Sequence, residues 1–109
     1  MEIQPGVFTS AHAEDGWEPD PEVGGEMKVL CETDGLEAGM SRFGQDPGPI
    51  SWTLPARETI LILEGEATIE IGEAEPITLR PGDMVSLPAR TPTTWHLTTP
   101  FREFWVLAG

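Results

Sequence analysis

Glycine and proline occur so often along this chain that every element of secondary structure must be short. The 109 residues include 12 glycines and 11 prolines. From residue 27 onward they separate segments rich in β-branched and aliphatic side chains. Residues 67–71 alternate apolar and polar side chains, which is typical of a strand with one buried face. No segment repeats apolar residues with a helical period, so roughly nine short strands predict an all-β sandwich or small barrel.

Turn residues set the expected bounds of these strands. We expect strands at 27–31, 36–43, 50–54, 58–63, 67–71, 77–79, 84–87, 93–98 and 102–107. Gly65 follows the fourth of them, and we expect it to supply a positive φ at a hairpin corner. Residues 80–83 (Arg-Pro-Gly-Asp) predict a second corner, because proline presets φ and glycine takes the strained position.

Residues 1–26 are the least regular part of the chain, since prolines, glycines and acidic residues dominate them. We therefore divide the chain into an irregular N-terminal arm (1–26) and a single barrel domain (27–109). Phe8 and Trp17 are costly to leave in water. We expect them to pack the arm onto its own barrel or onto a neighbouring subunit.

The charge balance excludes some classes of partner. Six lysines and arginines stand against nineteen acidic residues, which gives a net charge of −13. Such a surface repels phosphate backbones and anionic lipids, so we expect neither nucleic acid nor membrane partners. No apolar run approaches the roughly 20 residues of a membrane helix, and the N-terminus lacks the pattern of a signal peptide. With Cys31 as the single cysteine, these features predict a cytoplasmic protein.

Two segments resemble the paired motifs of the cupins. Glu58 precedes Gly65 by six intervening residues, as in the second half of the first cupin motif, and Gly82-Asp83 resembles the start of the second. Together with Trp52 and Trp95, this arrangement is similar to the small cupins grouped with the ethanolamine-utilisation and ureidoglycine aminohydrolase proteins. The resemblance covers residues 50–107 and implies a cupin-like antiparallel β-barrel, or jelly roll.

The same resemblance implies where metal ligands would stand. Two histidines are expected upstream of Glu58, but Trp52 and Leu54 occupy those positions, or Ser51 and Thr53 with a longer spacer. The last histidine position falls on Thr93. Only Glu58 remains of the four ligands, and one carboxylate does not hold a divalent transition metal usefully. We therefore expect no metal and no cofactor.

Two histidines keep a metal-binding alternative open. Strand parity turns His96 outward if Thr93 points inward, but a bulge near residues 91–92 would reverse this. His12 lies in the irregular arm and could reach a site only if the arm became ordered.

Parity counted from Glu58 predicts what lines the barrel. Trp52, Leu54, Ile60, Thr93 and Trp95 share its interior face and are candidate ligand-binding residues. We add Arg42 as a candidate contact for an anionic ligand group. Desolvation in this apolar cavity should raise the pKa of Glu58, unless Arg42, Arg57 or Arg102 lies close. In that case Glu58 would be salt-bridged and would only close one end of the barrel.

These observations favour a metal-independent, small-molecule-binding cupin. Glu58 would transfer a proton, as in an isomerase, a lyase or a cyclase, while Trp52 and Trp95 stack on the ligand. Two alternatives remain. One is a metal-dependent enzyme of the aminohydrolase or isomerase type, and the other is a non-catalytic binding or accessory protein.

A second packing surface is expected outside the barrel. Residues 101–107 are apolar on both faces after Glu103, and this stretch includes Trp105. Leu61 and Leu63 are likewise expected to point outward, because they alternate with the interior residues of their strand. Burial on both faces of a terminal strand predicts a homodimer.

Overall fold

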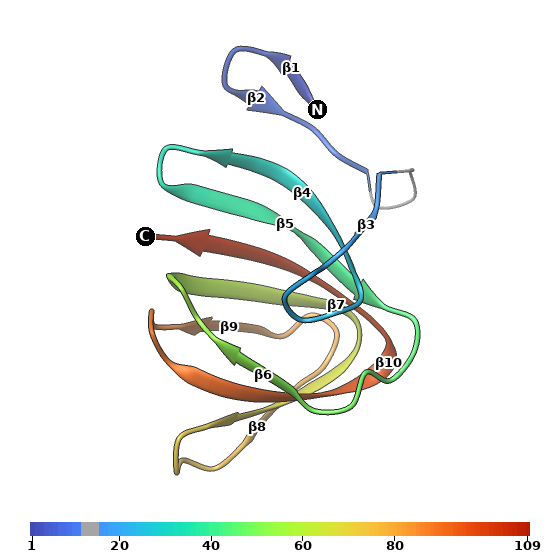
Figure 1. Ribbon diagram of the computed structural model, residues 1–109, viewed down its shortest axis with the longest axis vertical. Coiled ribbons are helices and arrows are strands. Elements are labelled where there is room, and N and C mark those ends of the chain that lie inside the picture. Colours follow the sequence, from blue (N-terminus) through green and yellow to red (C-terminus); the bar gives the residue numbers. More distant parts are fainter. Residues whose placement is uncertain (12–15) are drawn as a thin grey trace.

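The computed structural model describes residues 1–11 and 16–109, and in this part of the chain it contains strands and no helix (Figure 1). The predicted all-β architecture is confirmed. The strands are β1 (Glu2–Gln4), β2 (Val7–Phe8), β3 (Glu18–Pro19), β4 (Glu26–Thr33), β5 (Leu36–Phe43), β6 (Ile50–Thr53), β7 (Arg57–Ile71), β8 (Ile77–Leu79), β9 (Met84–Leu87) and β10 (Pro92–Ala108).

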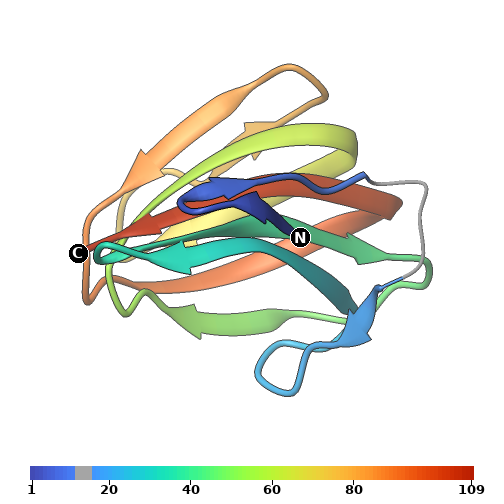
Figure 2. The same ribbon diagram turned by 90° about the horizontal axis from the view of Figure 1, so that it is seen from above.

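Two long strands, β7 and β10, connect the whole barrel. The main sheet has the order β3-β4-β5-β10-β7-β8, with β6 paired to β10 and β9 paired to β7. The first half of β10 pairs with β6 and with the second half of β7, and its second half pairs with β5 and with the first half of β7. Figure 2 shows β8 and β9 on one side of the molecule and β6 on the other, with β7 and β10 between them.

The expected hairpin corner at Gly65 is wrong. β7 continues without a break through this residue, which has a φ of +79° and bends the strand without reversing it. A Cβ at Gly65 would collide with the carbonyl oxygens of Thr98 and Pro100, so β10 crosses closest to β7 here. The strands expected at 93–98 and 102–107 are likewise one strand, β10, with register shifts between Thr98 and Glu103.

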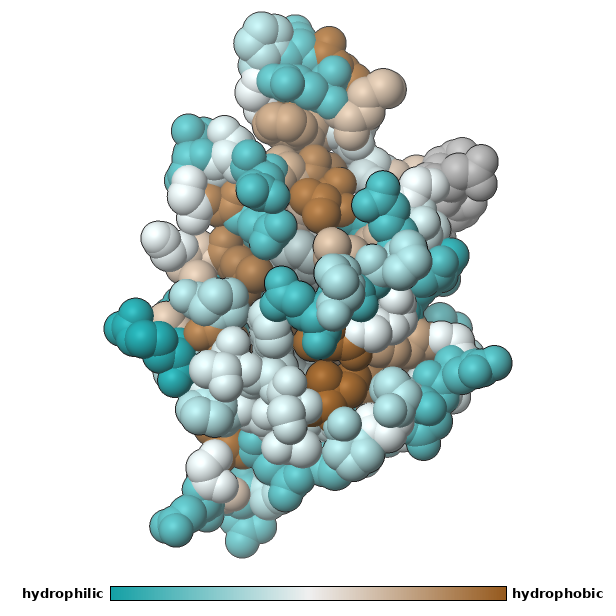
Figure 3. Space-filling model, in the orientation of Figure 1, coloured by the Kyte–Doolittle hydropathy of each residue, from teal (hydrophilic) through white to brown (hydrophobic). Residues whose placement is uncertain are grey.

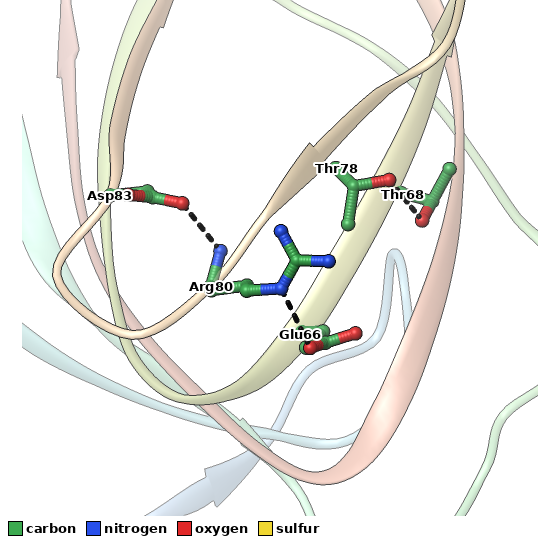
Figure 4. Close-up of polar contacts among 5 residues, drawn as sticks. All are labelled: Glu66, Thr68, Thr78, Arg80 and Asp83. Atoms are coloured by element: carbon green, nitrogen blue, oxygen red, sulfur yellow. Dashed lines mark hydrogen bonds and ion pairs between the residues drawn. The ribbon is translucent and has the colours of Figure 1, made fainter.

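The second predicted corner is confirmed. Gly82 has a φ of +93°, and the backbone N–H of Asp83 donates to the carbonyl of Arg80 at 2.9 Å. The Asp83 carboxylate in turn accepts a hydrogen bond from the backbone N–H of Arg80 at 2.8 Å. Figure 4 shows this corner with the side-chain contacts that join β8 to β7, namely Arg80 to Glu66 at 3.2 Å and Thr68 to Thr78 at 3.1 Å.

The interior face predicted by strand parity is buried. The buried positions on that face are Leu54, Glu58, Ile60, Ile62, Ala67, Ile69, Leu87, Thr93, Trp95 and Leu97. Phe43, Phe101 and Trp105 join them from β5 and the second half of β10. Among the described residues, no helix is long and apolar enough to cross a membrane.

Two residues of the N-terminal arm, Ala11 and Trp17, contact the outer face of the sheet. Trp17 is half-buried, and the guanidinium of Arg42 lies 4.2 Å from the centre of its ring. Lys28 and Arg102 also lie near this ring, and the ammonium of Lys28 donates to the carbonyl of Ala11 at 2.6 Å. The loop between β3 and β4 then passes in front of the barrel in the view of Figure 1, between β5 and β6.

Replacing Gly65 with alanine should destabilise the fold strongly. We expect Gly65→Ala to lower the free energy of unfolding by at least about 3 kcal/mol, because it adds backbone strain and a collision with β10. Gly72→Ala is the matched control, since Gly72 also has a positive φ but no atom lies within 4 Å of the added Cβ. It should cost about 1 kcal/mol. Urea denaturation measures both losses, and equal losses would contradict the close crossing at Gly65.

A candidate active-site cavity inside the barrel

A cavity of about 320 Å³ lies inside the barrel, next to the loop between β3 and β4. Its walls come from β5, β6, β7 and β10, and residues 20–23 of the loop lie at its mouth. Its aromatic side chains are Phe43, Trp52, Trp95, Phe101 and Trp105. This volume lies near the lower end of the range of about 300–1,000 Å³ that is typical of small-molecule sites.

Glu58 projects into this cavity from the first half of β7 and is 6% exposed. The indole N–H of Trp52 donates a hydrogen bond to its Oε1 at 3.0 Å. Burial raises the pKa of Glu58, as the sequence predicted, and the hydrogen bond from Trp52 opposes this rise. Among the described residues no lysine or arginine forms an ion pair with Glu58, so the salt-bridged alternative lacks its partner.

Glu103 is a second buried carboxyl group in the same cavity, and the sequence analysis missed it as a site residue. It lies on β10 opposite Ser41 of β5 and Ile62 of β7, and it is 9% exposed. Its Oε2 has no hydrogen-bond partner among the described residues. Burial, together with repulsion from Glu58, raises the pKa of Glu103 well above its ordinary value.

The three indole N–H groups at the cavity are all engaged. Trp52 donates to Glu58, as described above. Trp95 donates to the hydroxyl of Thr93 at 2.9 Å, and that hydroxyl donates to the carbonyl of Trp52 at 2.6 Å. Trp105 donates to the hydroxyl of Ser41 at 2.8 Å. These bonds hold the rings in place. Thr93 is not among the lining residues of the cavity, and it acts on the site through the indole of Trp95 and the backbone of Trp52.

The remaining predicted ligand-binding residues do not line the cavity. Leu54 and Ile60 are fully buried in the core. Arg42 lies on the outer face of β5, where it forms an ion pair with Glu26 at 2.9 Å and stacks on Trp17. The expected contact between Arg42 and a ligand in the barrel is therefore wrong. Its neighbours on β5, Ser41 and Phe43, point inward, and alternation turns Arg42 outward.

The side chains at the metal-ligand positions implied by the cupin resemblance do not fit a metal ion. Trp52 and Leu54 offer no donor atom of the required kind, and the Thr93 hydroxyl is already used between the indole of Trp95 and the backbone carbonyl of Trp52. His96 is exposed on the opposite face of β10, as parity predicted, with its Nε2 at 2.6 Å from Glu70. His12 lies outside the described residues. Within the described part of the chain, no three His, Cys, Asp or Glu side chains form a group that could hold a metal.

Comparison with known proteins agrees with this architecture. A family model described as the EutQ-like cupin domain matches residues 37–104. The chain belongs to this family. The predicted resemblance to small cupins of the ethanolamine-utilisation branch is thereby confirmed. A search of curated proteins finds no match.

Solved structures show the same cupin fold. The protein provisionally named ethanolamine utilization protein Q from Salmonella typhimurium superposes with a TM-score of 0.74 at 20% identity, over 94% of each chain. The Clostridium difficile EutQ protein gives 0.67 at 18% identity, over 82% of this chain and 71% of that one. A protein from Ralstonia eutropha, provisionally named a mannose-6-phosphate isomerase, gives 0.64 at 26% identity, over 75% and 82%.

The stability of this cupin should depend on pH through Glu103. Folding raises the pKa of Glu103, so the folded chain still holds this proton at pH values where the unfolded chain has lost it. Glu103 therefore contributes its full stabilisation at pH values below the pKa of the unfolded chain. This contribution declines as the pH rises toward the pKa of Glu103 in the folded chain. We expect the Glu103→Gln variant, which cannot titrate there, to gain stability relative to the wild type between about pH 5 and about pH 8.

Urea denaturation across this pH range measures the difference in unfolding free energy between the variant and the wild type. Glu73→Gln, in the exposed turn between β7 and β8, is the control and should follow the wild type at every pH. If the difference in unfolding free energy between Glu103→Gln and the wild type stays constant with pH, Glu103 has the same pKa in the folded and the unfolded chain, and the prediction is wrong.

Proposed function

We propose that this cupin binds a small organic molecule in its barrel and moves a proton on it without a metal ion. The reaction class would be that of an isomerase, a lyase or a cyclase. The observation that carries the proposal is the presence of Glu58 and Glu103 in one apolar cavity, with no cationic side chain beside either. Buried carboxyl groups with raised pKa values are suited to general acid–base catalysis near neutral pH.

Different surroundings assign different roles to the two carboxyl groups. The hydrogen bond from Trp52 favours the charged form of Glu58, which makes Glu58 the general base. Glu103 has no such donor on its Oε2, and its pKa is raised further, so it holds the proton and acts as the general acid. Repulsion from Glu58 adds to the effect of burial on the pKa of Glu103.

The register of β7 and β10 leaves room for a ligand between these groups. Glu58 pairs with Leu107, and Glu103 pairs with Ile62, four residues away along each strand. Four residues correspond to roughly 13 Å between the two backbone positions along a strand. Both side chains line the same cavity. Base and acid would then act on different atoms of one bound molecule, as proton-shift and elimination reactions require.

The names of related proteins give this proposal limited support. The Ralstonia eutropha relative carries the provisional name of an isomerase, which agrees with the reaction class proposed here. The EutQ relatives are named for ethanolamine utilization, which does not specify a reaction for this chain.

A deuterium-exchange screen tests proton transfer without a known substrate. The protein is incubated in D₂O with a library of small carbon acids, and mass spectrometry measures deuterium that enters carbon positions. We expect at least one compound to exchange in an enzyme-dependent way. Glu58→Gln should slow this exchange at least about a hundredfold, because the amide cannot accept the proton. Glu73→Gln is the control and should exchange at the wild-type rate.

Three outcomes would change the proposal. Exchange that survives Glu58→Gln would remove Glu58 from the base role. Binding of library compounds without any exchange would favour the non-catalytic alternative. Exchange abolished by a chelator and restored by a divalent metal would favour the metal-dependent alternative.

We also propose that the chain forms a homodimer through the outer face of its sheet. An apolar row crosses four strands in register there, made of Met40, Phe104, Leu61 and Met84. Met84 is 72% exposed, and the other three are half-buried. Trp105, from which the interface was first inferred, instead faces the chain's own cavity and is buried there.

Placing a charge in this row should separate the subunits. We expect Met84→Lys to shift the protein from dimer to monomer at micromolar concentration, because a lysine is costly to bury in an apolar interface. Thr78→Lys on β8 adds the same charge outside the row and should leave the dimer intact. Light scattering measures the mass in each case. A wild-type protein that is already monomeric would contradict the proposed interface.

A further inference from the structure

The charges around the barrel cavity are of one sign. Five ionisable side chains line it, and all are acidic: Asp20, Glu22, Glu37, Glu58 and Glu103. None of the six lysines and arginines of the chain is among the lining residues. A carboxylate or phosphate ligand would therefore meet only like charges here, and like charges in a poorly hydrated site repel strongly.

The basic residues are placed elsewhere in the fold. Lys28, Arg42 and Arg102 surround Trp17 on the outer face of the sheet. Arg57 donates to Ser86 on the surface. The other two, Arg80 and Arg90, are exposed. With only six such residues, their complete separation from a cavity lined by five acids is a specific feature of the site.

Glu103 provides an independent indication of what the cavity binds. It is nine-tenths buried, it lines the cavity, and its Oε2 lacks a hydrogen-bond partner among the described residues. A buried oxygen of this kind is costly unless a donor reaches it. A ligand that brings a donor with a positive charge would satisfy this oxygen, and it would favour the ionised form of Glu103 over the protonated form that burial favours.

The aromatic walls fit the same ligand. Trp52, Trp95 and Trp105 have already engaged their N–H groups within the barrel. They can therefore offer a ligand only ring surface, which attracts cations and apolar groups. Indoles are the aromatic side chains that bind cations best.

We infer that the barrel cavity is a binding site for a small organic cation, in the first place a protonated amine whose N–H would reach Oε2 of Glu103. Its positive group would lie between the indoles and the carboxyl groups of Glu58 and Glu103, and its apolar part would face Phe43 and Phe101. This inference rests on the small-molecule site of the proposed function, but it does not depend on proton transfer. Asp20 and Glu22 at the mouth, together with the net charge of −13, would draw cations toward the opening.

Calorimetric titration with probes of one shape and different charge tests this inference. Isoamylamine is the cationic probe, isoamyl alcohol its neutral counterpart and isovalerate its anionic counterpart, and choline is a second cation. We expect at least one cation to bind with a Kd at least about tenfold below that of the alcohol. Isovalerate should not bind. The inference is overturned if neither cation binds at about 10 mM, or if the alcohol or isovalerate binds as tightly.

Variants of the two carboxyl groups test whether they cause the preference for cations over neutral compounds. Glu103→Gln should weaken binding of the cation about tenfold and leave binding of isoamyl alcohol unchanged, since the amide keeps the shape of the side chain. Glu58→Gln provides the same measurement if the first variant does not fold, and Glu73→Gln is the control. An equal loss for cation and alcohol would assign a structural role to the carboxyl and would contradict the inference.

The two proposals fail separately. Selective cation binding without deuterium exchange in the carbon-acid screen would reject proton transfer and keep the cation site. Exchange on neutral or anionic compounds, with no preference for the cationic probes, would reject the cation site and keep the acid–base pair.

Discussion

The antiparallel pairing of β7 with β10 is the constraint on which the rest of the structure depends. These two strands pair from Glu58 opposite Leu107 at one end to Thr93 opposite Ile71 at the other. Every other strand of the barrel except β3 and β4 pairs with one of them. Their register also decides the chemistry, because it brings one carboxyl group from each strand to the same interior face.

Some polar groups inside the barrel have hydrogen-bond partners and one does not, and this difference points to the candidate site. Each indole N–H at the cavity finds a nearby oxygen, whereas one oxygen of Glu103 finds none among the described residues. A packed core would be more stable with an apolar side chain at this position, because burying a carboxyl group without a partner costs free energy. Packing therefore gives no reason for Glu103, which agrees with the role in binding or catalysis proposed above.

Strand parity predicted much of the fold and part of the site. The alternation from Glu58 through Ile60 and Ile62 is local to one strand, so it placed the interior face correctly. The outward direction of His96 followed in the same way from Thr93. Such inferences succeed because alternation within a continuous strand is a property of the backbone itself.

The predictions that failed concern residues whose position depends on contacts with strands that are distant in the sequence. A glycine with a positive φ serves a hairpin turn and a bend equally well, and only the close passage of β10 makes Gly65 a bend. Arg42 lies on β5, and the loop at residues 44–49 and β6 come between β5 and β7 in the chain, so parity could not be carried over to it. Glu103 lies beyond the register shifts near Thr98, within a segment whose apolar residues on both faces drew attention to an interface.

The side chains at the ligand positions of the cupin pattern explain why this barrel favours carboxyl and aromatic chemistry. Imidazoles at those positions would bring a cation into the site as a bound metal. Trp52 and Trp95 instead line the cavity with ring surface, while Glu58 keeps its place and Glu103 adds a second carboxyl group. Among the described residues, the cavity lining thus has acidic groups and aromatic surface but no positive group. A ligand that carries the positive charge itself would complete the electrostatics of the cavity, and its proton would lie within reach of the two groups suited to move it.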